Sequence, residues 1–424
     1  MKILYVGHLA IPIRDILTGK TEKQITGWPA YFQPVYRLIQ EGNQVEFVFT
    51  SDLKDYQIKV DWLNAKQIVE NVYYDKEKAI KFGLISRIIY RIFYNHKFKT
   101  SVKKAIKNNN YDFIYCQEIN GYWGNVYANK YKVPCGVRIY GDTFYHREKT
   151  LSKYEYLKKH GILGLFRLNP KIVLLYKMKK SFMLTTADGT HGDLTYEILK
   201  PHKNKYDFYY WTTGVNKCAP YEENDITKNI VGIKYIVYPA RIDTIKRQDN
   251  AIDVLSYIHK SGHKIHLFLV GQNNNEKQYN MLIDKINNLK LQDYVHFTGG
   301  VTQNQVKLYS KYSIATILTS DLSNRGNVFF ELFSIGTPII SFDDGSLNDY
   351  IIHGVNGFLA KNTFEMSEYV ISILENRNLR DTISNNALNT AKEKVISNEI
   401  RFNSEIELIK KYVYSNNNCL PKKM

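Results

Sequence analysis

Short apolar runs alternate with longer amphipathic stretches along the first half of the chain. Lys2–Gly7 and Val45–Thr50 are apolar runs typical of buried strands, whereas Pro29–Gln40 carries its apolar residues at helical spacing before Gly42. This alternation predicts a parallel sheet with helices on both faces. Further strands are expected at Asp112–Cys116, Pro134–Tyr140 and Phe182–Thr186, and further helices at Ile80–Asn108 and Tyr122–Tyr131.

The pattern begins afresh after about Asn216. Lys217–Ile230 has the composition of a linker, and a second series of strands and helices follows it. The sequence therefore predicts an α/β protein of two Rossmann-like, doubly wound parallel-sheet domains, residues 1–215 and 216–398. Because such sheets bind ligands at the carboxyl ends of their strands, we expect the domains to face a central cleft. In the second series, strands are expected at Lys234–Tyr238, His266–Gly271, Tyr294–Phe297, Ile314–Leu318 and Thr337–Ser341, and helices at Asp249–Ser261, Lys277–Asn288, up to Tyr309 and from Val328.

Composition excludes several classes of protein. With 44% hydrophobic, 14% aromatic and 23% charged residues, the chain is not expected to be disordered. No uninterrupted apolar stretch approaches ~18 residues, so no spanning helix is expected, and Met1–Ile13 is interpreted as a first strand rather than a signal peptide. The cysteines show no CxxC spacing and suggest neither a zinc site nor a disulfide framework, which favours the cytosol; they are Cys116, Cys135, Cys218 and Cys419.

The net charge of +17 is concentrated in the first half, because residues 1–215 carry +15 and residues 216–424 only +2. Segment 76–110 has 10 Lys and Arg against one Glu, and segment 151–180 has 8 against one Glu. Basic amphipathic helices suit an anionic membrane surface, but their apolar faces could equally pack on the domain's own sheet. Nucleic-acid binding is a rival interpretation, although no helix-turn-helix, RNA-recognition or zinc motif accompanies the charge. The large apolar residues of these segments include Phe98, Leu163, Leu165, Val173 and Leu175.

The most specific segment is Ile317–Ser341, in which a strand leads through a polar loop with Gly326 to a helix that opens near Asn327. The unpaired N–H groups at such a helix start suit a phosphate. Glu331 follows about one turn later, where a carboxylate can accept hydrogen bonds from ribose hydroxyls. The alternative is a capped core helix in which Glu331 merely complements the helix dipole.

Together with Gly336-Thr337-Pro338, this segment resembles the donor-site signature of the family 4 retaining glycosyltransferases of the GT-B fold. Several motifs occur around it in the family's order, and the resemblance is strong over about residues 234–360. These motifs are Tyr238–Lys246, with Arg241 and Lys246 five residues apart, Phe268–Gly271, Val295–Gly299, Asp344–Asp349 and Asn356–Leu359. As in the family, the helix Glu399–Tyr414 is expected to pack on the first domain through Phe402, Ile406, Ile409 and Val413.

The resemblance implies that Arg241 and Lys246 hold the diphosphate of a nucleotide sugar, a role for which fixed cations are suited; otherwise they are two surface cations. It assigns Glu331 to the ribose and places Gly299 against the base. The backbone amides of Gly326, Asn327 and Val328 are expected to bind the distal phosphate. One departure is that the family's first signature glutamate falls on Ser323, so that Asp321 or Asn324 could contact the transferred sugar instead.

The first half resembles the family's acceptor side. Tyr140 stands where the family commonly has a histidine, so Asp142 and His146 become candidates for proton transfer or acceptor binding, although an Asp after a strand is commonly a loop cap. Gly27 falls near the family's glycine-rich loop, and Trp28 could stack on a sugar. His8, just after the first strand, is a further acceptor candidate, or a loop histidine with ordinary hydrogen bonds.

The implied reaction transfers a sugar, most simply from a UDP-sugar, to a hydroxyl of a glycan or lipid-linked acceptor with retention of configuration. No cofactor, metal or nucleic acid is expected, and the enzyme is expected in the cytoplasm at the inner face of the membrane, in surface polysaccharide or glycoconjugate synthesis. The rivals are a sugar-nucleotide epimerase of the same fold and a catalytically silent partner subunit, which the serine at position 323 motivates.

Overall fold

The apolar runs of the first half form a seven-stranded parallel sheet in the order β3-β2-β1-β4-β5-β6-β7. Its inner strands are buried on both faces, which explains why they are continuous apolar runs rather than alternating ones. The strands are β1 (Lys2–His8), β2 (Gln44–Thr50), β3 (Gln67–Val69), β4 (Phe113–Gln117), β5 (Cys135–Ile139), β6 (Phe182–Thr186) and β7 (Asp207–Trp211).

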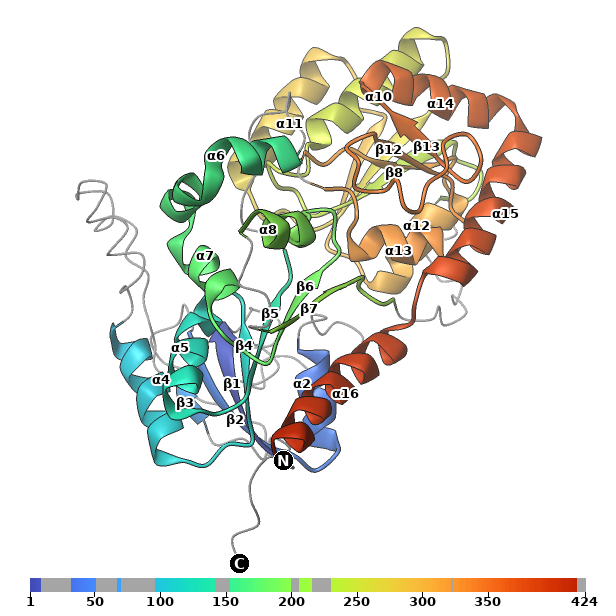
Figure 1. Ribbon diagram of the computed structural model, residues 1–424. Helices are drawn as coiled ribbons and strands as arrows, with labels where there is room; N and C mark the ends of the chain where they lie inside the picture. Colours follow the sequence, from blue (N-terminus) through green and yellow to red (C-terminus); the bar gives the residue numbers. More distant parts are fainter. Residues whose placement is uncertain are drawn as a thin grey trace, which may run out of the picture. The chain divides into compact units, whose positions relative to one another are not determined.

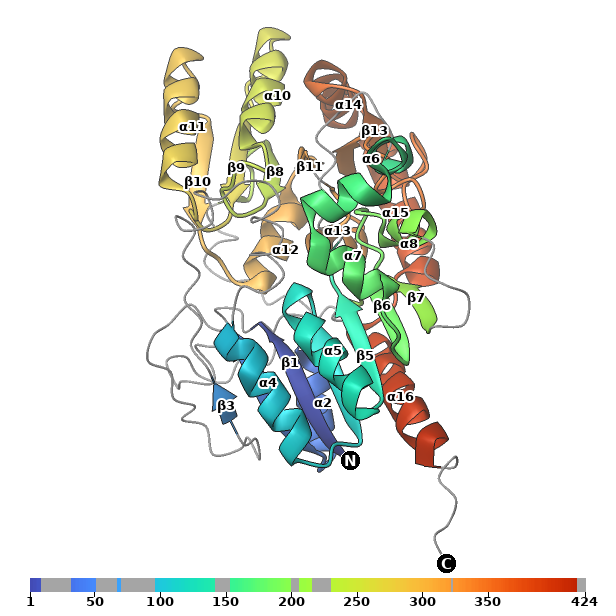
Figure 2. The same cartoon turned by 60° about the vertical axis from the view of Figure 1, so that its left-hand side comes forward.

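Helices cover both faces of this sheet (Figures 1 and 2). Leu4 and Val6 belong to a core with α4 and α5, whereas Ile3 and Tyr5 belong to a second core with α2 and α16, because successive residues of a strand point to opposite faces. The helices are α2 (Gln33–Gln40), α4 (His96–Asn108), α5 (Tyr122–Tyr131), α6 (Lys153–Leu168), α7 (Pro170–Lys177), α8 (Gly192–Leu199) and α16 (Asn398–Asn417).

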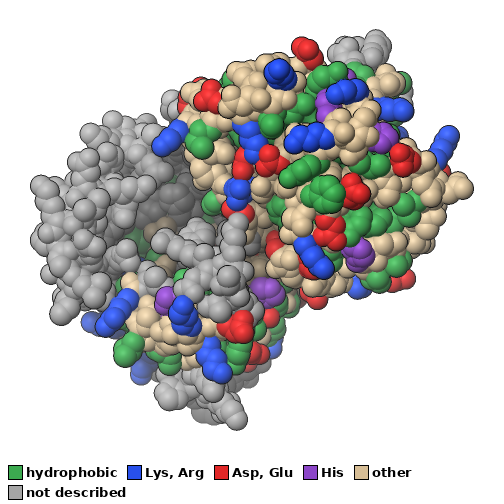
Figure 3. All heavy atoms as spheres, turned by 90° about the horizontal axis from the view of Figure 1, so that it is seen from above, with side chains coloured by type: hydrophobic (Ala, Val, Ile, Leu, Met, Phe, Trp, Pro, Cys, Tyr) green, Lys and Arg blue, Asp and Glu red, His purple; other side chains and the backbone are tan. Residues whose placement is uncertain are grey.

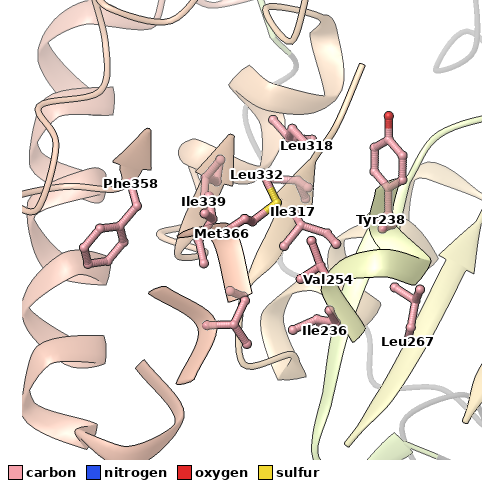
Figure 4. Packing of buried hydrophobic residues seen from close by; sticks show 14 of the residues in the cluster. Ile236, Tyr238, Val254, Leu267, Ile317, Leu318, Leu332, Ile339, Phe358 and Met366 are labelled. Atoms are coloured by element: carbon pink, nitrogen blue, oxygen red, sulfur yellow. The ribbon is translucent and has the colours of Figure 1, made fainter. Parts of the chain in front are cut away.

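The second series of elements forms a six-stranded parallel sheet in the order β10-β9-β8-β11-β12-β13. Figure 4 shows its main core, where Ile236 of β8, Ile317 of β11 and Ile339 of β12 meet Val254 of α10 and Met366 of α14. The elements are β8 (Tyr235–Pro239), α10 (Gln248–Lys260), β9 (His266–Val270), α11 (Glu276–Asn288), β10 (Val295–Gly299), α12 (Gln303–Tyr312), β11 (Thr316–Leu318), α13 (Asn327–Phe333), β12 (Ile339–Phe342), β13 (Phe358–Ala360), α14 (Thr363–Glu375) and α15 (Arg377–Lys394).

The chain divides into two compact units. The first consists of residues 1–187, 191–213 and 400–424, and the second of residues 188–190 and 214–399. This computed structural model describes residues 1–8, 32–50, 67–69, 96–141, 153–199, 206–215, 230–321 and 323–417. The expected linker 217–230, apart from its last residue, and the first part of the helix expected at Ile80–Asn108 lie outside the described residues.

The last helix, α16, belongs to the first unit rather than to the second, which precedes it in the sequence. Its buried residues Ile406, Ile409 and Val413 share a core with Ile3 and Tyr5 of β1. These are apolar positions whose helical spacing requires a partner face. The chain therefore returns to its starting unit after it has completed the second one.

A buried cluster of charges lies where α16 meets the first sheet. Glu405 of α16 is 1% exposed, and one of its carboxylate oxygens lies 2.9 Å from Arg401 and 3.7 Å from Arg138 of β5. The hydroxyl of Tyr115 donates a hydrogen bond to the same carboxylate. Burial raises the pKa of Glu405 and lowers that of Arg401. One carboxylate therefore faces two guanidinium groups away from water.

The basic segment 151–180 forms two helices rather than a single amphipathic face. Asn169 caps α7 by accepting a hydrogen bond from the Ile172 amide, and Pro170 occupies the first helical position, where its missing N–H is harmless. Several apolar side chains of both basic segments are buried in the first unit's core, so they are not available to a membrane; these are Phe98, Leu165, Val173 and Leu175. By contrast, Leu163 of α6 is 78% exposed.

We predict that Glu405→Ala destabilises the protein by about 3–5 kcal/mol, because it leaves two buried guanidinium groups without their counter-charge. The matched control is Glu407→Ala in the same helix, where the carboxylate is 70% exposed and pairs with Lys410. This change should cost less than about 1 kcal/mol. Urea unfolding of both variants measures the difference, and equal costs would show that the cluster does not hold α16 in place.

Candidate functional site

Two loops meet at the carboxyl edge of the second sheet, one after β8 and one after β11. Within the second unit, the Asp321 amide donates to the Ile245 carbonyl at 3.0 Å, and the Ser320 hydroxyl donates to the same oxygen at 3.2 Å. Parallel neighbouring strands end on the same side, so their following loops are brought together. The β8 loop carries Arg241 and Lys246, and the β11 loop leads to Gly326.

Arg241 and Lys246 lie at opposite ends of the β8 loop, whose backbone is held by buried side chains. Gln248 donates to the Arg241 carbonyl at 2.8 Å, and the Tyr238 hydroxyl donates to the Lys246 carbonyl at 2.5 Å. The Arg241 side chain is 57% exposed and lies 3.4 Å from Asp243. Burial, together with the nearby Arg241, lowers the pKa of Lys246. The loop thus presents two neighbouring cations on a fixed backbone.

The loop after β11 ends at Gly326, the residue before α13. Gly326 and Asn327 are exposed and Val328 is half-buried. No side chain caps this helix start, and a Cβ placed on Gly326 would meet no described atom within 4 Å. The first turn therefore has no side-chain cap and an open space beside Gly326, which suits the close approach of an anion.

Glu331 lies about one turn into α13 and is 8% exposed. Burial raises the pKa of its carboxyl group. Gln303, the first residue of α12, donates a hydrogen bond from its side-chain amide to this carboxylate. That contact uses Oε1, so the carboxylate keeps further acceptor sites, including those on Oε2, for hydrogen bonds from a ligand.

Ser323 and Asn324 stand between these elements. The Ser323 hydroxyl accepts a hydrogen bond from the Arg325 amide at 3.1 Å. Asn324 is 7% exposed, and its side chain accepts from the Ser320 amide at 3.0 Å and donates to Asp344 at 2.9 Å. The buried Asn324 side chain therefore holds the backbone of the loop after β11 in place.

The ends of β9 and β10 approach the β8 loop through glycines. A Cβ on Gly271 would lie 2.3 Å from the Ala240 carbonyl oxygen, so no other residue fits there without a backbone shift. Gly271 also forms a bridge with Gly299, whose φ of +69° favours glycine. Gly299 is exposed, and its bridge to Gly271, which packs against Ala240, places it at the same edge as Arg241.

The expected acceptor residues are only partly covered by the structure. Tyr140, just after β5, has its ring over Arg138 at 4.2 Å, and its amide donates to Glu118 at 2.6 Å. Burial raises the pKa of the Tyr140 hydroxyl to about 12, so it is protonated at neutral pH. His8 ends β1, and its side chain is not described. Gly27, Trp28, Asp142 and His146 lie outside the described residues.

Two residues of this region were not predicted from the sequence. Gln303 touches Glu331 although 28 residues separate them, and only the Thr302–Gln305 capping box, which marks the start of α12, points to its location. Arg247 joins the two loops through Asp321, and a lone Arg next to Lys246 gives no sequence signal for that contact. Among the described residues, no three His, Cys, Asp or Glu side chains gather as a metal site would require.

Comparison with known proteins identifies the region that contains these loops. Residues 222–390 match the family model described as "Glycosyl transferases group 1". This part of the chain is therefore similar to the group 1 glycosyltransferases. The matched region contains the loop after β11, which we call the glycine loop because it ends at Gly326. It also contains Glu331, Arg241 and Lys246, whereas the first unit lies outside it.

Curated relatives match about half of the chain at low identity. N-acetyl-alpha-D-glucosaminyl L-malate synthase of Bacillus anthracis is 22% identical over 236 residues, which are 54% of this chain and 59% of the relative. Alpha-monoglucosyldiacylglycerol synthase of Streptococcus pneumoniae is 23% identical over 194 residues, 43% of either protein. The chain thus spans about half the length of the curated relatives it matches.

Solved structures extend the similarity of fold beyond residues 222–390. Anabaena HepE in complex with UDP aligns with a TM-score of 0.65 and 16% identity over 99% of this chain and 100% of that one. Sucrose-phosphate synthase from Thermosynechococcus elongatus aligns with a TM-score of 0.69 and 14% identity over 98% and 100%. Both confirm two Rossmann-like α/β domains. None of the helices in the described part of the chain has the length and apolar character that a membrane crossing requires.

Proposed function

We propose that this protein transfers a sugar from a nucleoside-diphosphate sugar to an acceptor hydroxyl, with retention of the anomeric configuration. The observation that carries this proposal is the carboxyl edge of the second sheet, where Arg241, Lys246, the start of α13 and Glu331 are placed by adjoining loops. The group 1 family match over the same residues supports it. The preferred donor is a UDP-sugar, since HepE, a structural neighbour, has been solved with UDP and with UDP-glucose.

The chemistry asks the protein mainly for positioning and charge stabilisation. As the bond between the anomeric carbon and the diphosphate breaks, negative charge grows on the leaving oxygen, and fixed cations lower the energy of that state. Arg241 and Lys246 are placed for this role. The acceptor hydroxyl attacks on the face from which the diphosphate leaves, and its proton passes to the departing phosphate. No protein nucleophile is required by this route.

The acceptor is proposed to be a glycan or a lipid-linked molecule, in the synthesis of bacterial surface polysaccharide or glycoconjugates. One curated relative is named for a glucosylated diacylglycerol, and WaaG, a structural neighbour, is described as a glycosyltransferase of lipopolysaccharide biosynthesis. The positive charge of residues 1–215 supports an acceptor that is anionic or lies at an anionic surface.

Arg241→Ala and Lys246→Ala are each expected to lower kcat by about 100- to 1,000-fold, which is typical of removing one preorganised group that stabilises developing charge. Release of UDP from a panel of UDP-sugars measures the effect. Lys260→Ala, an exposed lysine at the end of α10, is the control and should behave like the parent. Parental rates in both variants would remove these cations from the mechanism. UDP binding without turnover in the parent would favour a silent partner subunit.

Glu331→Gln is expected to weaken the binding of both UDP and uridine by about tenfold or more, because a hydrogen bond to a charged group contributes about 1.5–3 kcal/mol. Lys246→Ala should instead weaken UDP and leave uridine unchanged, since uridine lacks the diphosphate. Calorimetric titration of both ligands separates the two roles. Unchanged uridine affinity in Glu331→Gln would contradict the ribose assignment, and Glu375→Gln at an exposed site serves as the control.

We also propose that the protein attaches peripherally to an anionic membrane through the middle of α6. Ile162 and Leu163, which are 44% and 78% exposed, directly follow the non-helical residue Gly161 that breaks α6. The exposed cations Lys158 and Lys159 and the exposed Tyr154 lie before that break. On the face shown in Figure 3, basic and acidic side chains of the described residues are interspersed, so charge alone does not mark a surface there. The combination of exposed apolar and basic residues close together in the sequence on either side of Gly161 supports a bilayer as the partner.

Leu163→Asp should release the protein from vesicles that contain anionic lipid, because it removes apolar insertion and adds repulsion. Co-sedimentation with anionic and with neutral vesicles measures binding, which should also fall with salt. Met281→Asp, at an apolar residue of α11 in the other unit that is 56% exposed, should bind like the parent. If the parent binds neither kind of vesicle, or both equally, the membrane proposal fails while the transfer reaction stands.

A further inference from the structure

Arg247, the residue after Lys246, has an unusual backbone conformation. Its φ of 54° and ψ of 49° are left-handed, a region that glycine and asparagine tolerate and that other L residues seldom adopt. Arg247 also immediately precedes α10, where the chain turns from the β8 loop into the helix. Only other contacts of the residue can hold it in this conformation.

The guanidinium group of Arg247 supplies those contacts. Its Nε and Nη2 donate to both oxygens of Asp249 in the first turn of α10, at 2.9 Å and 2.8 Å. Its Nη1 donates to both oxygens of Asp321, at 3.0 Å and 2.8 Å. Its Nη2 also donates to Asn250 at 3.3 Å. One side chain thus joins the start of α10 to the loop after β11.

Hydrogen bonds to backbone carbonyls next to Arg247 join the β8 loop to the segment after β11. Thr319 donates from its hydroxyl to the carbonyls of Lys246 and Arg247, at 3.4 Å and 2.9 Å. The Asp321 amide donates to the Ile245 carbonyl at 3.0 Å. Arg247 therefore lies at the junction between the loop that carries the proposed cations and the loop that leads to Gly326.

We propose that Arg247 is a positioning residue that fixes Lys246 relative to the glycine loop, so that both reach the same diphosphate. This inference rests on the proposed function. It also gives Asp321 a definite role, because this carboxylate holds Arg247 and does not stand in for the glutamate that Ser323 replaces.

Stability is not the main consequence of this arrangement. Both ion pairs are partly exposed, with about a third of each side chain accessible to water, and such pairs contribute little to folding. A displacement of a catalytic group by about 1 Å, however, can lower a rate by about 100-fold. The left-handed backbone at Arg247 is therefore better explained by the need to place Lys246 accurately than by a gain in folding free energy.

Arg247→Gly and Arg247→Asn test the proposal, because both new residues accept the left-handed conformation but cannot reach Asp321. We expect kcat/KM with a UDP-sugar to fall by about 10- to 100-fold and UDP to bind more weakly, with uridine binding unchanged. Melting temperatures should stay within about 4 °C of the parent. Arg247→Lys should retain part of the activity, since it keeps the charge but loses the fork that bonds both carboxylates.

Asp321→Asn should reproduce the loss, and the double variant with Arg247→Gly should cost no more than the worse single change, because both remove one contact. Asp253→Asn, which removes an ion pair with Lys285 on the far side of α10, is the matched control and should keep the parental rate.

Parental rates in both Arg247 variants, or losses that follow large drops in melting temperature, would overturn the positioning role. A parent that neither binds UDP nor consumes any UDP-sugar would instead overturn the proposed function itself.

Discussion

Parallel strand pairing is the constraint on which the site of this protein depends. When all strands of a sheet run in one direction, every following loop emerges at one edge, and residues far apart in the sequence are gathered there. In the second unit this gathers Arg241, Gly299 and Gly326 at one edge. The same loops lose regular backbone pairing, so side chains must satisfy their carbonyls. Tyr238 and Thr319 do so for Lys246, and this links the buried core directly to the candidate site.

The protein uses arginine–carboxylate groups in two environments with different physical consequences. Around Glu405 the charges are removed from water, so the loss of one partner is costly, and the group determines where α16 docks. Around Asp321 the charges remain partly hydrated, so little folding free energy depends on them. Their main effect is to fix the positions of the two loops that they join. Burial therefore decides whether the same chemistry serves folding or the placement of neighbouring atoms.

Much of the fold could be predicted from the sequence, because buried parallel strands are continuous apolar runs. β1, β6 and α5 were located within a residue or matched exactly, and the second series was found in its full order up to β12. The edge strand β7 was missed, because its aromatic residues are half-exposed and give no buried pattern. Periodicity also could not say what covers an apolar face, which is why Leu165 and Leu163 looked alike although one is buried and the other is not.

Some residues of the candidate site could be predicted from the sequence and others could not. Arg241, Lys246 and Glu331 could be identified because their spacing within short segments carries the signal. Gln303 and Arg247 could not, since their contacts with Glu331 and Asp321 join segments that are distant in sequence and depend on side-chain direction. The roles of Gly27, Trp28, Asp142 and His146 stay predictions.

The position of α16 in the sequence has a consequence for how the protein is made. Ile406 and Ile409 cover the face of the first sheet that Ile3 and Tyr5 line, yet they are translated roughly 190 residues after β7. At about 5–20 residues/s, the part of that face that α16 covers waits about 10–40 s, although α2 of the same core is made early. During this interval the nascent first unit exposes an aromatic-rich sheet surface while the second unit completes its own core. The half of the protein that is synthesised first is therefore the half that finishes folding last, and a chaperone that binds the ribosome-bound chain would find its longest-lived target there.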